Sequence, residues 1–272
     1  MWLSTLNISK EMTEKTENVE NFINWRLSLV VVFCAHLLFS SFVDAACADP
    51  PAPGVNWAGC DKTGLVLKNQ DLSGAVLSRM KLIGADFSGC RLENAELNFS
   101  DLSNARFDGA RMKDSRLVAV KGRGVSFKNT VLDQASFSRA RLEKADFTGA
   151  SLDQAKFYEA RLPGANFSGA LLTGANFEGA RLEKAIFDQA NLSSAILLSA
   201  SMESASVRDA SLDHAILDRA NLLSADFTGS NLTQASLREA LIDGSIFDDA
   251  NLSDAIWVNF KRCRLDSKGK CE

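Results

Sequence analysis

Every fifth residue between positions 67 and 257 is large and apolar, with one exception. The series begins at Leu67 and ends at Trp257, and only Gly122 in it is not Leu, Phe, Met, Val, Ile or Trp. The residue two positions before each member is small, and it is most often Ala. No residue is inserted or deleted over the whole stretch. A fixed period of this kind predicts a repeat architecture.

A period of five fits neither a helix nor a flat strand. On an α-helix, residues five apart are separated by about 140° and spread around the whole surface. On a strand, they alternate between opposite faces. A chain that turns a corner every five residues directs each apolar residue inward, and four corners close a coil of about 20 residues whose neighbours pair at about 4.8 Å. The period therefore predicts an all-β fold, a quadrilateral parallel β-helix of nearly ten coils.

Phenylalanines recur within the apolar series at intervals of twenty residues. They form two sets, ten residues out of phase, and the remaining positions are mostly Leu. The first set is Phe87, Phe107, Phe127, Phe147, Phe167, Phe187, Phe227 and Phe247, and the second is Phe137, Phe157 and Phe177. On a 20-residue coil the two sets occupy opposite inner faces. We therefore expect the rings to stack along the axis and to meet across the core.

The two residues after each apolar position form the corner. Gly or Asn often occupies the second of them, as at Gly74 and Asn94. A type II turn requires a positive φ at this position, which Gly and Asn tolerate. Where Lys, Gln, Asp or Glu stands there, we expect a different turn type.

Gly122 leaves one central position without a side chain. The missing apolar group predicts a cavity or a structural bulge, and Val120 and Val125 stand beside it where Ala is usual and can refill the space. The alternative is a functional kink that presents Lys121 and Arg123.

Residues 85–89 and 165–169 carry Ala, then Asp or Asn, then Phe, at their first three positions. These runs resemble the A(D/N)Lxx repeat of the pentapeptide-repeat family, and the resemblance extends over residues 67–260. It implies a right-handed quadrilateral β-helix. Functions known in the family include DNA mimicry that blocks or protects topoisomerases, but many members are repeat scaffolds, so the resemblance fixes the fold and leaves the function open.

Residues 1–46 combine a polar segment with an apolar run at 27–43. Arg26 precedes the run, and Ala45, Ala46 and Ala48 follow it, which is typical of a signal peptide and its cleavage site. An uncleaved membrane anchor and a non-membrane apolar segment remain alternatives, as does a true start at Met12. We expect a cleaved signal and export to the periplasm or cell envelope.

The rest of the chain divides into a cap, the repeats and a tail. Residues 47–66 are the predicted N-terminal cap, in which Val55 and Trp57 cover the first coil. Residues 67–260 are the predicted β-helix. Residues 261–272 are the predicted C-terminal cap or tail.

Removal of the signal takes away Cys34 and leaves five cysteines, four of which lie outside the repeats, two at each end of the solenoid. The ends are separated by roughly 45 Å, so only pairs within one end can form disulfides, and the same distance excludes a four-ligand metal site. The predicted structural disulfides join Cys47 to Cys60 and Cys263 to Cys271. Export makes such bonds stable. Cys90 occupies a small inward position and is expected to be a buried free thiol.

The chain offers few groups for catalysis. It contains two histidines, His36 and His214, and one tyrosine, Tyr158. His36 falls in the apolar run, and the other two stand at outward corners, so no Ser-His-Asp set is expected. The sequence predicts a protein without enzymatic activity, cofactor or metal.

Charge is distributed unevenly along the repeats. From Arg106 to Lys144 there are ten basic and four acidic residues, a net charge of +6, whereas from Ala145 to Trp257 there are seven and sixteen, a net charge of −9. We expect no basic stripe over more than two coils, and therefore no binding of nucleic acid. A DNA mimic needs a sustained acidic surface. A cytoplasmic DNA-mimicking topoisomerase modulator is the alternative to an exported protein-binding scaffold of unknown partner.

Outward apolar residues become more frequent toward the C-terminal half. They predict an interaction stripe for self-association or for a protein partner. The predicted stripe consists of Ile196, Leu198, Ile216 and Ile256.

Overall fold

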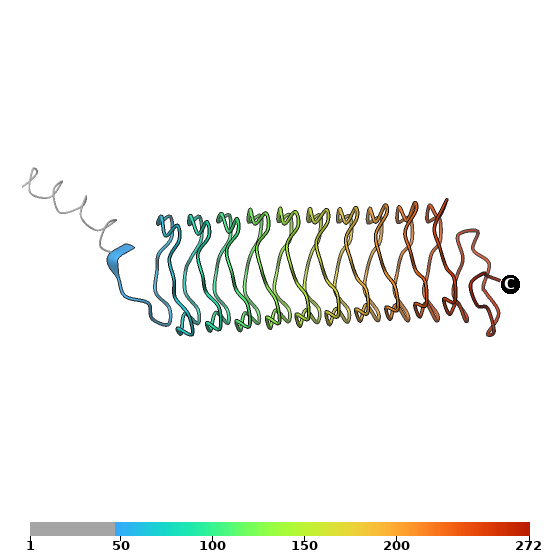
Figure 1. The fold of residues 1–272 in the computed structure, drawn as a ribbon, viewed down its shortest axis with the longest axis horizontal. Helices are drawn as coiled ribbons and strands as arrows, with labels where there is room; N and C mark the ends of the chain where they lie inside the picture. Colours follow the sequence, from blue (N-terminus) through green and yellow to red (C-terminus); the bar gives the residue numbers. More distant parts are fainter. Residues whose placement is uncertain (1–46) are drawn as a thin grey trace, which may run out of the picture. The chain divides into compact units, whose positions relative to one another are not determined.

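The computed structural model describes residues 47–272, of which Asp49–Glu272 form one compact unit. Residues 47–48 are helical, and no residue in the range 49–272 is. The regular structure of the unit is a series of single-residue parallel bridges, from Asn56 with Val76 to Ser236 with Ile256, and each joins residues 20 positions apart. The unit is therefore a parallel β-helix whose 20-residue coils stack along one axis (Figure 1). The predicted all-β solenoid is confirmed.

The core is a column of central side chains enclosed by small residues. Almost all central residues and the Ala before them are fully buried. Phe147 and Phe167, one coil apart, stack with ring centroids 4.8 Å apart, and Phe157 and Phe167 meet edge to face across the core at 5.8 Å. The stacking distance matches the spacing of paired strands. The two predicted Phe sets and their contact across the core are confirmed.

Every corner from residue 54 to residue 254 has the same backbone conformation. The second corner residue has a φ between 52° and 76° whatever its type, including Gln134, Lys144 and Glu159. The expectation of a different turn type at such residues is wrong. The Lys144 N–H donates to the Pro163 carbonyl of the next coil at 3.0 Å. Bonds of this kind offset a left-handed conformation that costs about 1–2 kcal/mol in a non-Gly residue.

The coil containing Gly122 keeps the common register. Lys121 bridges Arg141, and the Gly122 N–H donates to the Arg141 carbonyl at 2.8 Å. A Cβ at Gly122 would lie 2.8 Å from Leu142 Cδ2 and 3.1 Å from Val125 Cγ1. The expected bulge and the functional kink are both wrong, because these two side chains fill the space. The refilling by Val125 is confirmed.

The β-helix begins earlier than the predicted residue 67. Asn56, Asp61 and Val66 already bridge residues of the following coil, and Trp57 occupies a central position with 1% of its surface exposed. Trp57 is therefore part of the first coil and does not belong to a separate cap. Lys62 stands at the next central position with its ammonium 4.4 Å from the Trp57 ring centroid. Lys62 stands where the repeat usually has an apolar residue, and its ammonium packs on the aromatic face of Trp57. The apolar period therefore does not show where the β-helix begins.

The C-terminal segment folds back over the last coil. Lys268 and Arg262 form antiparallel bridges with Asn251 and Ile256. The Leu252 N–H donates to the Ser267 carbonyl at 2.9 Å. Figure 1 shows this segment crossing the red end of the stack. It satisfies part of an edge that would otherwise template pairing with another chain.

The predicted signal segment at residues 27–43 lies outside the described residues, as do Met12 and Arg26. Between residues 47 and 272, no helix is long and apolar enough to cross a membrane.

Candidate interaction surface

One outward column of the β-helix contains four cations in succession, between Asp101 and Ser201. The residue before each central position points outward and forms the bridge to the next coil. In one column Lys121 bridges Arg141, Arg141 bridges Arg161 and Arg161 bridges Arg181. These four residues are called the basic ladder below. With coils about 4.8 Å apart, the ladder is roughly 14 Å long.

The expectation that no basic stripe extends over more than two coils is wrong. The net charge of a segment averages over four faces, whereas residues 20 apart share one face. Counting in steps of 20 shows the ladder in the sequence itself. The same count gives no acidic column longer than two coils among residues 49–272; Asp133 with Asp153 and Glu183 with Glu203 are the pairs.

The ladder lacks the ion pairs that most other arginines of the rod make. Lys121, Arg141 and Arg161 form no ion pair with any residue between 47 and 272, and Arg181 alone contacts a carboxylate, Glu183 Oε1, at 3.1 Å from its Nε. Like charges placed directly opposite each other on neighbouring strands destabilise a sheet. The fold therefore stacks four cations of which three, Lys121, Arg141 and Arg161, make no ion pair within the described coils.

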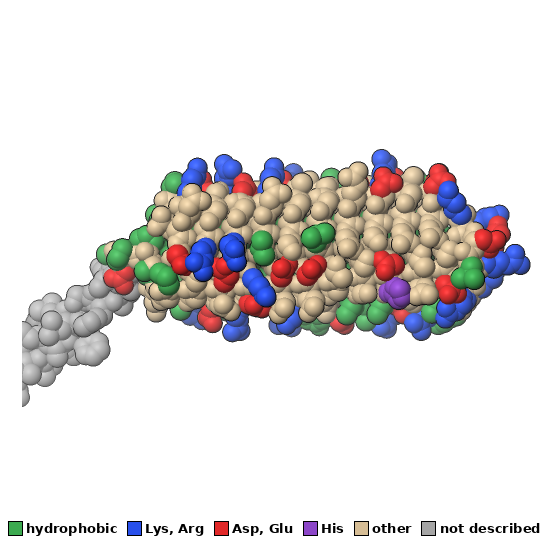
Figure 2. All heavy atoms as spheres, turned by 90° about the horizontal axis from the view of Figure 1, so that it is seen from below, with side chains coloured by type: hydrophobic (Ala, Val, Ile, Leu, Met, Phe, Trp, Pro, Cys, Tyr) green, Lys and Arg blue, Asp and Glu red, His purple; other side chains and the backbone are tan. Residues whose placement is uncertain are grey.

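Most arginines elsewhere on the rod lie beside carboxylates. Arg111 Nε is 2.8 Å from Glu93 Oε1, and Arg106 Nη2 is 2.9 Å from Asp108 Oδ2. Figure 2 shows a face on which blue and red side chains lie next to one another. Charge pairing is thus the common arrangement, and the ladder departs from it.

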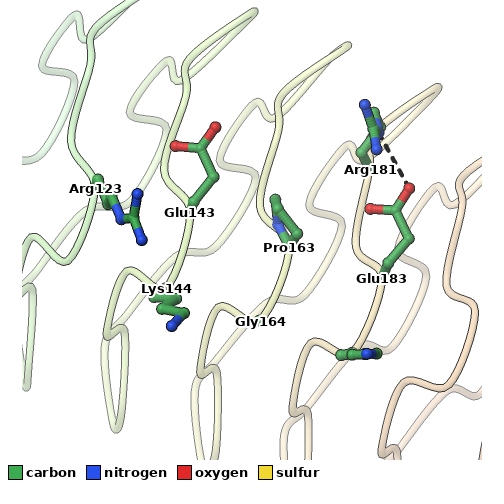
Figure 3. Close-up of a pocket in the computed structure, with 8 residues that line it drawn as sticks. Arg123, Glu143, Lys144, Pro163, Gly164, Arg181 and Glu183 are labelled. Atoms are coloured by element: carbon green, nitrogen blue, oxygen red, sulfur yellow. Dashed lines mark hydrogen bonds and ion pairs between the residues drawn. The ribbon is translucent and has the colours of Figure 1, made fainter.

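A hollow of about 640 Å³ lies on one side of the ladder. Pro163 and Gly164 form its floor, between the coil that carries Glu143 and Lys144 and the coil that carries Glu183 (Figure 3). Gly164 has a φ of 66° and no side chain to fill the space. The lining also includes Arg123, Arg181 and Lys184, so cations outnumber carboxylates.

A second hollow of about 430 Å³ lies on the other side. It is lined by Arg139, Arg141, Glu159, Arg161, Gly179 and Arg181. Arg139 Nε is 2.9 Å from Glu159 Oε2, and this contact, with the Tyr158 hydroxyl, holds the pKa of the Glu159 carboxyl below its usual value. The ladder is thus a ridge of cations with a hollow on each side.

The predicted apolar stripe is only partly assembled. Ile196 and Ile216 bridge each other, and Leu198 follows in the same coil as Ile196; Ile216 is 39% exposed and the other two are half-buried. Ser236 separates them from Ile256 and is buried at 7% exposure. Ile256 is half-buried, and its backbone bridges the C-terminal segment. The structure therefore brings three of the four residues together.

A crossing ion pair explains the interruption at Ser236. Arg238 Nε lies 3.3 Å from Asp218 Oδ2 and also donates to the Ser236 hydroxyl at 3.0 Å. These polar side chains cover the column between Ile216 and Ile256.

The predicted disulfide residues lie near the two ends of the described chain. Cys263 is bonded to Cys271. Cys47 and Cys60 are each disulfide-bonded, and their pairing with each other stays a prediction. Cys90 is a buried free thiol, as expected, and burial raises its pKa.

His214 stands beside a serine and an aspartate without the order that catalysis needs. Its Nδ1 is 3.2 Å from Asp213 Oδ2. The Ser193 hydroxyl donates to the other oxygen of Asp213, and this bond, first among several, lowers the pKa of that carboxyl. In a catalytic triad the imidazole lies between the hydroxyl and the carboxylate. Here the Asp213 carboxylate lies between the Ser193 hydroxyl and the His214 imidazole. Within residues 47–272 there is no cluster of three or more His, Cys, Asp or Glu suited to a metal ion.

Comparison with known families identifies the repeat. The family described as "Pentapeptide repeats (8 copies)" matches residues 63–98, 150–189, 170–209, 185–222, 205–244 and 220–256, and "Pentapeptide repeat region" matches residues 91–167. Together the matches run from residue 63 to residue 256, more than half of the chain. The chain belongs to the pentapeptide repeat family, whose members fold as right-handed β-helices.

Solved structures of the family include HetL, a pentapeptide repeat protein involved in heterocyst differentiation regulation from Nostoc sp. strain PCC 7120. It is 28% identical with a TM-score of 0.52, over 76% of this chain and 93% of that one. A pentapeptide repeat protein from the Arabidopsis thaliana thylakoid lumen is 29% identical with a TM-score of 0.34, over 34% of this chain and 65% of that one. Among curated proteins, a sequence comparison found no match.

Proposed function

We propose that this chain is a non-enzymatic protein-binding scaffold, exported to the periplasm or cell envelope. Its proposed form is a quadrilateral β-helix of nearly ten coils that works through its flat outer faces. The observation that carries the proposal is the unbroken bridge register from residue 56 to residue 256. This register holds outward residues in fixed columns, and these include the basic ladder, in which Arg181 alone has an ion pair within the described coils.

Export rests on residues at the two ends of the repeats. The apolar run at 27–43 has the composition of a secretory signal. The bond between Cys263 and Cys271, together with the bonded state of Cys47 and Cys60, suits an oxidising compartment. The proposal of binding without turnover agrees with the similarity to HetL, whose described role is in regulation.

The alternative of a DNA-mimicking topoisomerase modulator has less support. Mimicry of a duplex requires a sustained line of negative charge. Acidic columns between residues 49 and 272 stop at two coils, and the longest column of one sign is positive.

The intact mass of the protein from fractionated source cells tests export. We expect the loss of about 45 residues, which keeps Cys47 in the mature chain, with a gain of four hydrogens on reduction, in the periplasmic or envelope fraction. A full-length chain with free thiols in the cytoplasm would overturn the proposal, and a full-length chain in the membrane pellet would establish the anchor instead.

Photo-cross-linking in the same cells tests the scaffold. A photoreactive residue is placed, one position at a time, at an outward site of each of the four columns. Protein adducts confined to one or two faces are expected of a scaffold. Uniform labelling, or none, on all four faces would contradict it.

A further inference from the structure

We propose that the basic ladder binds an extended acidic peptide segment of a protein partner, with Asp or Glu at alternate positions. The inference rests on the proposed scaffold function and adds the chemistry of the partner. It begins from Lys121, Arg141 and Arg161, which have no ion pair within the described coils. Their mutual repulsion is relieved when anions lie between and beside them.

The length of the ladder fits a short extended segment. An extended chain rises about 3.3 Å per residue, and its side chains alternate between two faces. Over the ladder's roughly 14 Å, an extended segment of about five residues presents three carboxylates on one face. Alternate carboxylates are about 6.6 Å apart and the cations about 4.8 Å apart, so the middle carboxylate lies between Arg141 and Arg161 and the outer two lie beside Lys121 and Arg181.

The surroundings of the ladder select a narrow anion. Glu143 and Glu183 line the hollow on one side, and Glu159 lines the hollow on the other. A broad anionic surface, such as a membrane or a DNA duplex, would bring its own charges against these carboxylates at the same time as it met the ladder. A single extended chain lies along the ridge between them.

The hollows provide room beside the ridge. Gly164 and Gly179 leave the two depressions open, and Pro163 gives the first a small apolar floor. In an extended peptide, the side chains that do not face the ladder point away from it, and the peptide's flanks lie over the hollows. Small or polar residues between the acidic ones suit this position.

Single-stranded nucleic acid is the competing polyanion. Its non-specific binders combine a basic groove with exposed aromatic rings on which bases stack. Lys121, Arg141, Arg161 and Arg181 have no aromatic residue among them, and the residues that line the two hollows include none. The composition of the site therefore favours carboxylates over nucleotides.

Binding of synthetic peptides to the full chain tests the proposal. The probe is a fluorescent nine-residue peptide with Glu at alternate positions and Ser between them. One control peptide has Gln in place of Glu, and a second holds the same Glu residues in one contiguous block. Fluorescence anisotropy is measured at low salt and again with added salt, because exposed ion pairs weaken as salt increases.

Two matched variants separate the ladder from general charge. The ladder variant carries Lys121→Gln, Arg141→Gln, Arg161→Gln and Arg181→Gln. The control variant carries Arg91→Gln, Arg111→Gln, Arg208→Gln and Arg238→Gln, which removes the same charge from arginines that have carboxylate partners. Circular dichroism on both variants establishes that the fold is kept.

The expected result is that the alternating peptide binds the wild type and the control variant alike and loses roughly tenfold or more in affinity with the ladder variant. Equal losses in the two variants would overturn the proposal, as would equal binding of the contiguous or the Gln peptide. Tighter binding of a single-stranded oligonucleotide through the ladder would assign the site to nucleic acid instead. None of these outcomes alters the export and cross-linking tests, so the scaffold function can stand or fall separately.

Discussion

The basic ladder and the paired arginines use the same position of the repeat in opposite ways. Arg91 and Arg111 stand on neighbouring coils, as Arg141 and Arg161 do. Both residues of the first pair contact carboxylates, with Arg111 Nε 2.8 Å from Glu93 Oε1 and Arg91 Nη1 3.4 Å from Asp71 Oδ2. Those of the second pair contact none in the described chain. Identical backbone geometry thus supports either arrangement, so the ladder is a property of the side chains chosen and is not required by the fold.

Core truncations give the largest expected effect and test whether the two regions share one interior. Leu162 follows Arg161 and Leu92 follows Arg91, and both are fully buried. Leu162→Ala and Leu92→Ala are each expected to lower the free energy of unfolding by about 2–5 kcal/mol, because each leaves a cavity. Denaturant unfolding measures both. A much smaller loss of stability for Leu162→Ala than for Leu92→Ala would show that the core beneath the ladder differs from the core beneath the paired arginines. That result would contradict the view that the two regions differ only in their outward side chains.

Gly122 offers a second way to probe the interior beneath the ladder. A side chain at this position meets Leu142 Cδ2 and Val125 Cγ1, so Gly122→Leu is expected to cost about 1–3 kcal/mol by overpacking. Adding Val125→Ala removes one of the two obstacles and is expected to recover part of the loss. Thermal unfolding of the single and double variants checks this. A single variant as stable as the wild type would show an unfilled cavity there.

Gly122 also shows where reasoning from the sequence ends. The period of five predicts the coil, the inward Ala and the two Phe sets, because each depends on spacing alone. The bulge predicted at Gly122 is wrong, because Leu142 of the next coil fills the space. A pattern of every fifth residue does not show which neighbouring side chain can occupy such a space. The turn at Lys144 is mispredicted for a similar reason, since the hydrogen bond to Pro163 outweighs the residue's own preference.

The ladder is present in the sequence, but the net charge of a segment does not reveal it, because that sum averages over all four faces. Steps of 20 residues, which the two Phe sets already define, place Lys121, Arg141 and Arg161 in one line. The absence of carboxylates within reach could not be deduced in the same way. Long side chains such as Arg181 contact residues in the same coil, whereas Arg111 contacts the coil before it. Only side-chain geometry separates a paired cation from an unpaired one.

Single charge removals are expected to have opposite signs in the two regions. Arg161→Gln relieves repulsion from Arg141 and should raise the free energy of unfolding by a few tenths of a kcal/mol, whereas Arg111→Gln breaks the contact with Glu93 and should lower it by about 0.2–1 kcal/mol. Thermal unfolding at low salt measures both changes. Added salt should shrink them, because the side chains are exposed. Changes of equal sign would remove the basis for treating the ladder as uncompensated.

Acid titration gives the smallest expected effect, and Asp71 beside Arg91 shows it in the region of the paired arginines. The Ser73 hydroxyl and N–H donate to Asp71 Oδ1 at 2.7 and 3.0 Å, and these bonds, with Arg91 nearby, hold the pKa of the Asp71 carboxyl below its usual value. A carboxyl with a lowered folded-state pKa contributes stability that is fully present above its unfolded value of about 3.9 and is lost as the pH falls through the folded one.

Asp71→Asn should therefore flatten the dependence of the melting temperature on pH as the pH falls below about 5. Asn166 supplies the matched control, since its Oδ1 already accepts from the Ser168 N–H at 2.9 Å in the same geometry without a charge. Asn166→Asp should steepen the same dependence. The arginines of the ladder stay charged throughout this range, so Arg161→Gln should leave the slope unchanged. A slope that changes with Arg161→Gln as much as with Asp71→Asn would show that the two regions are coupled electrostatically along the rod.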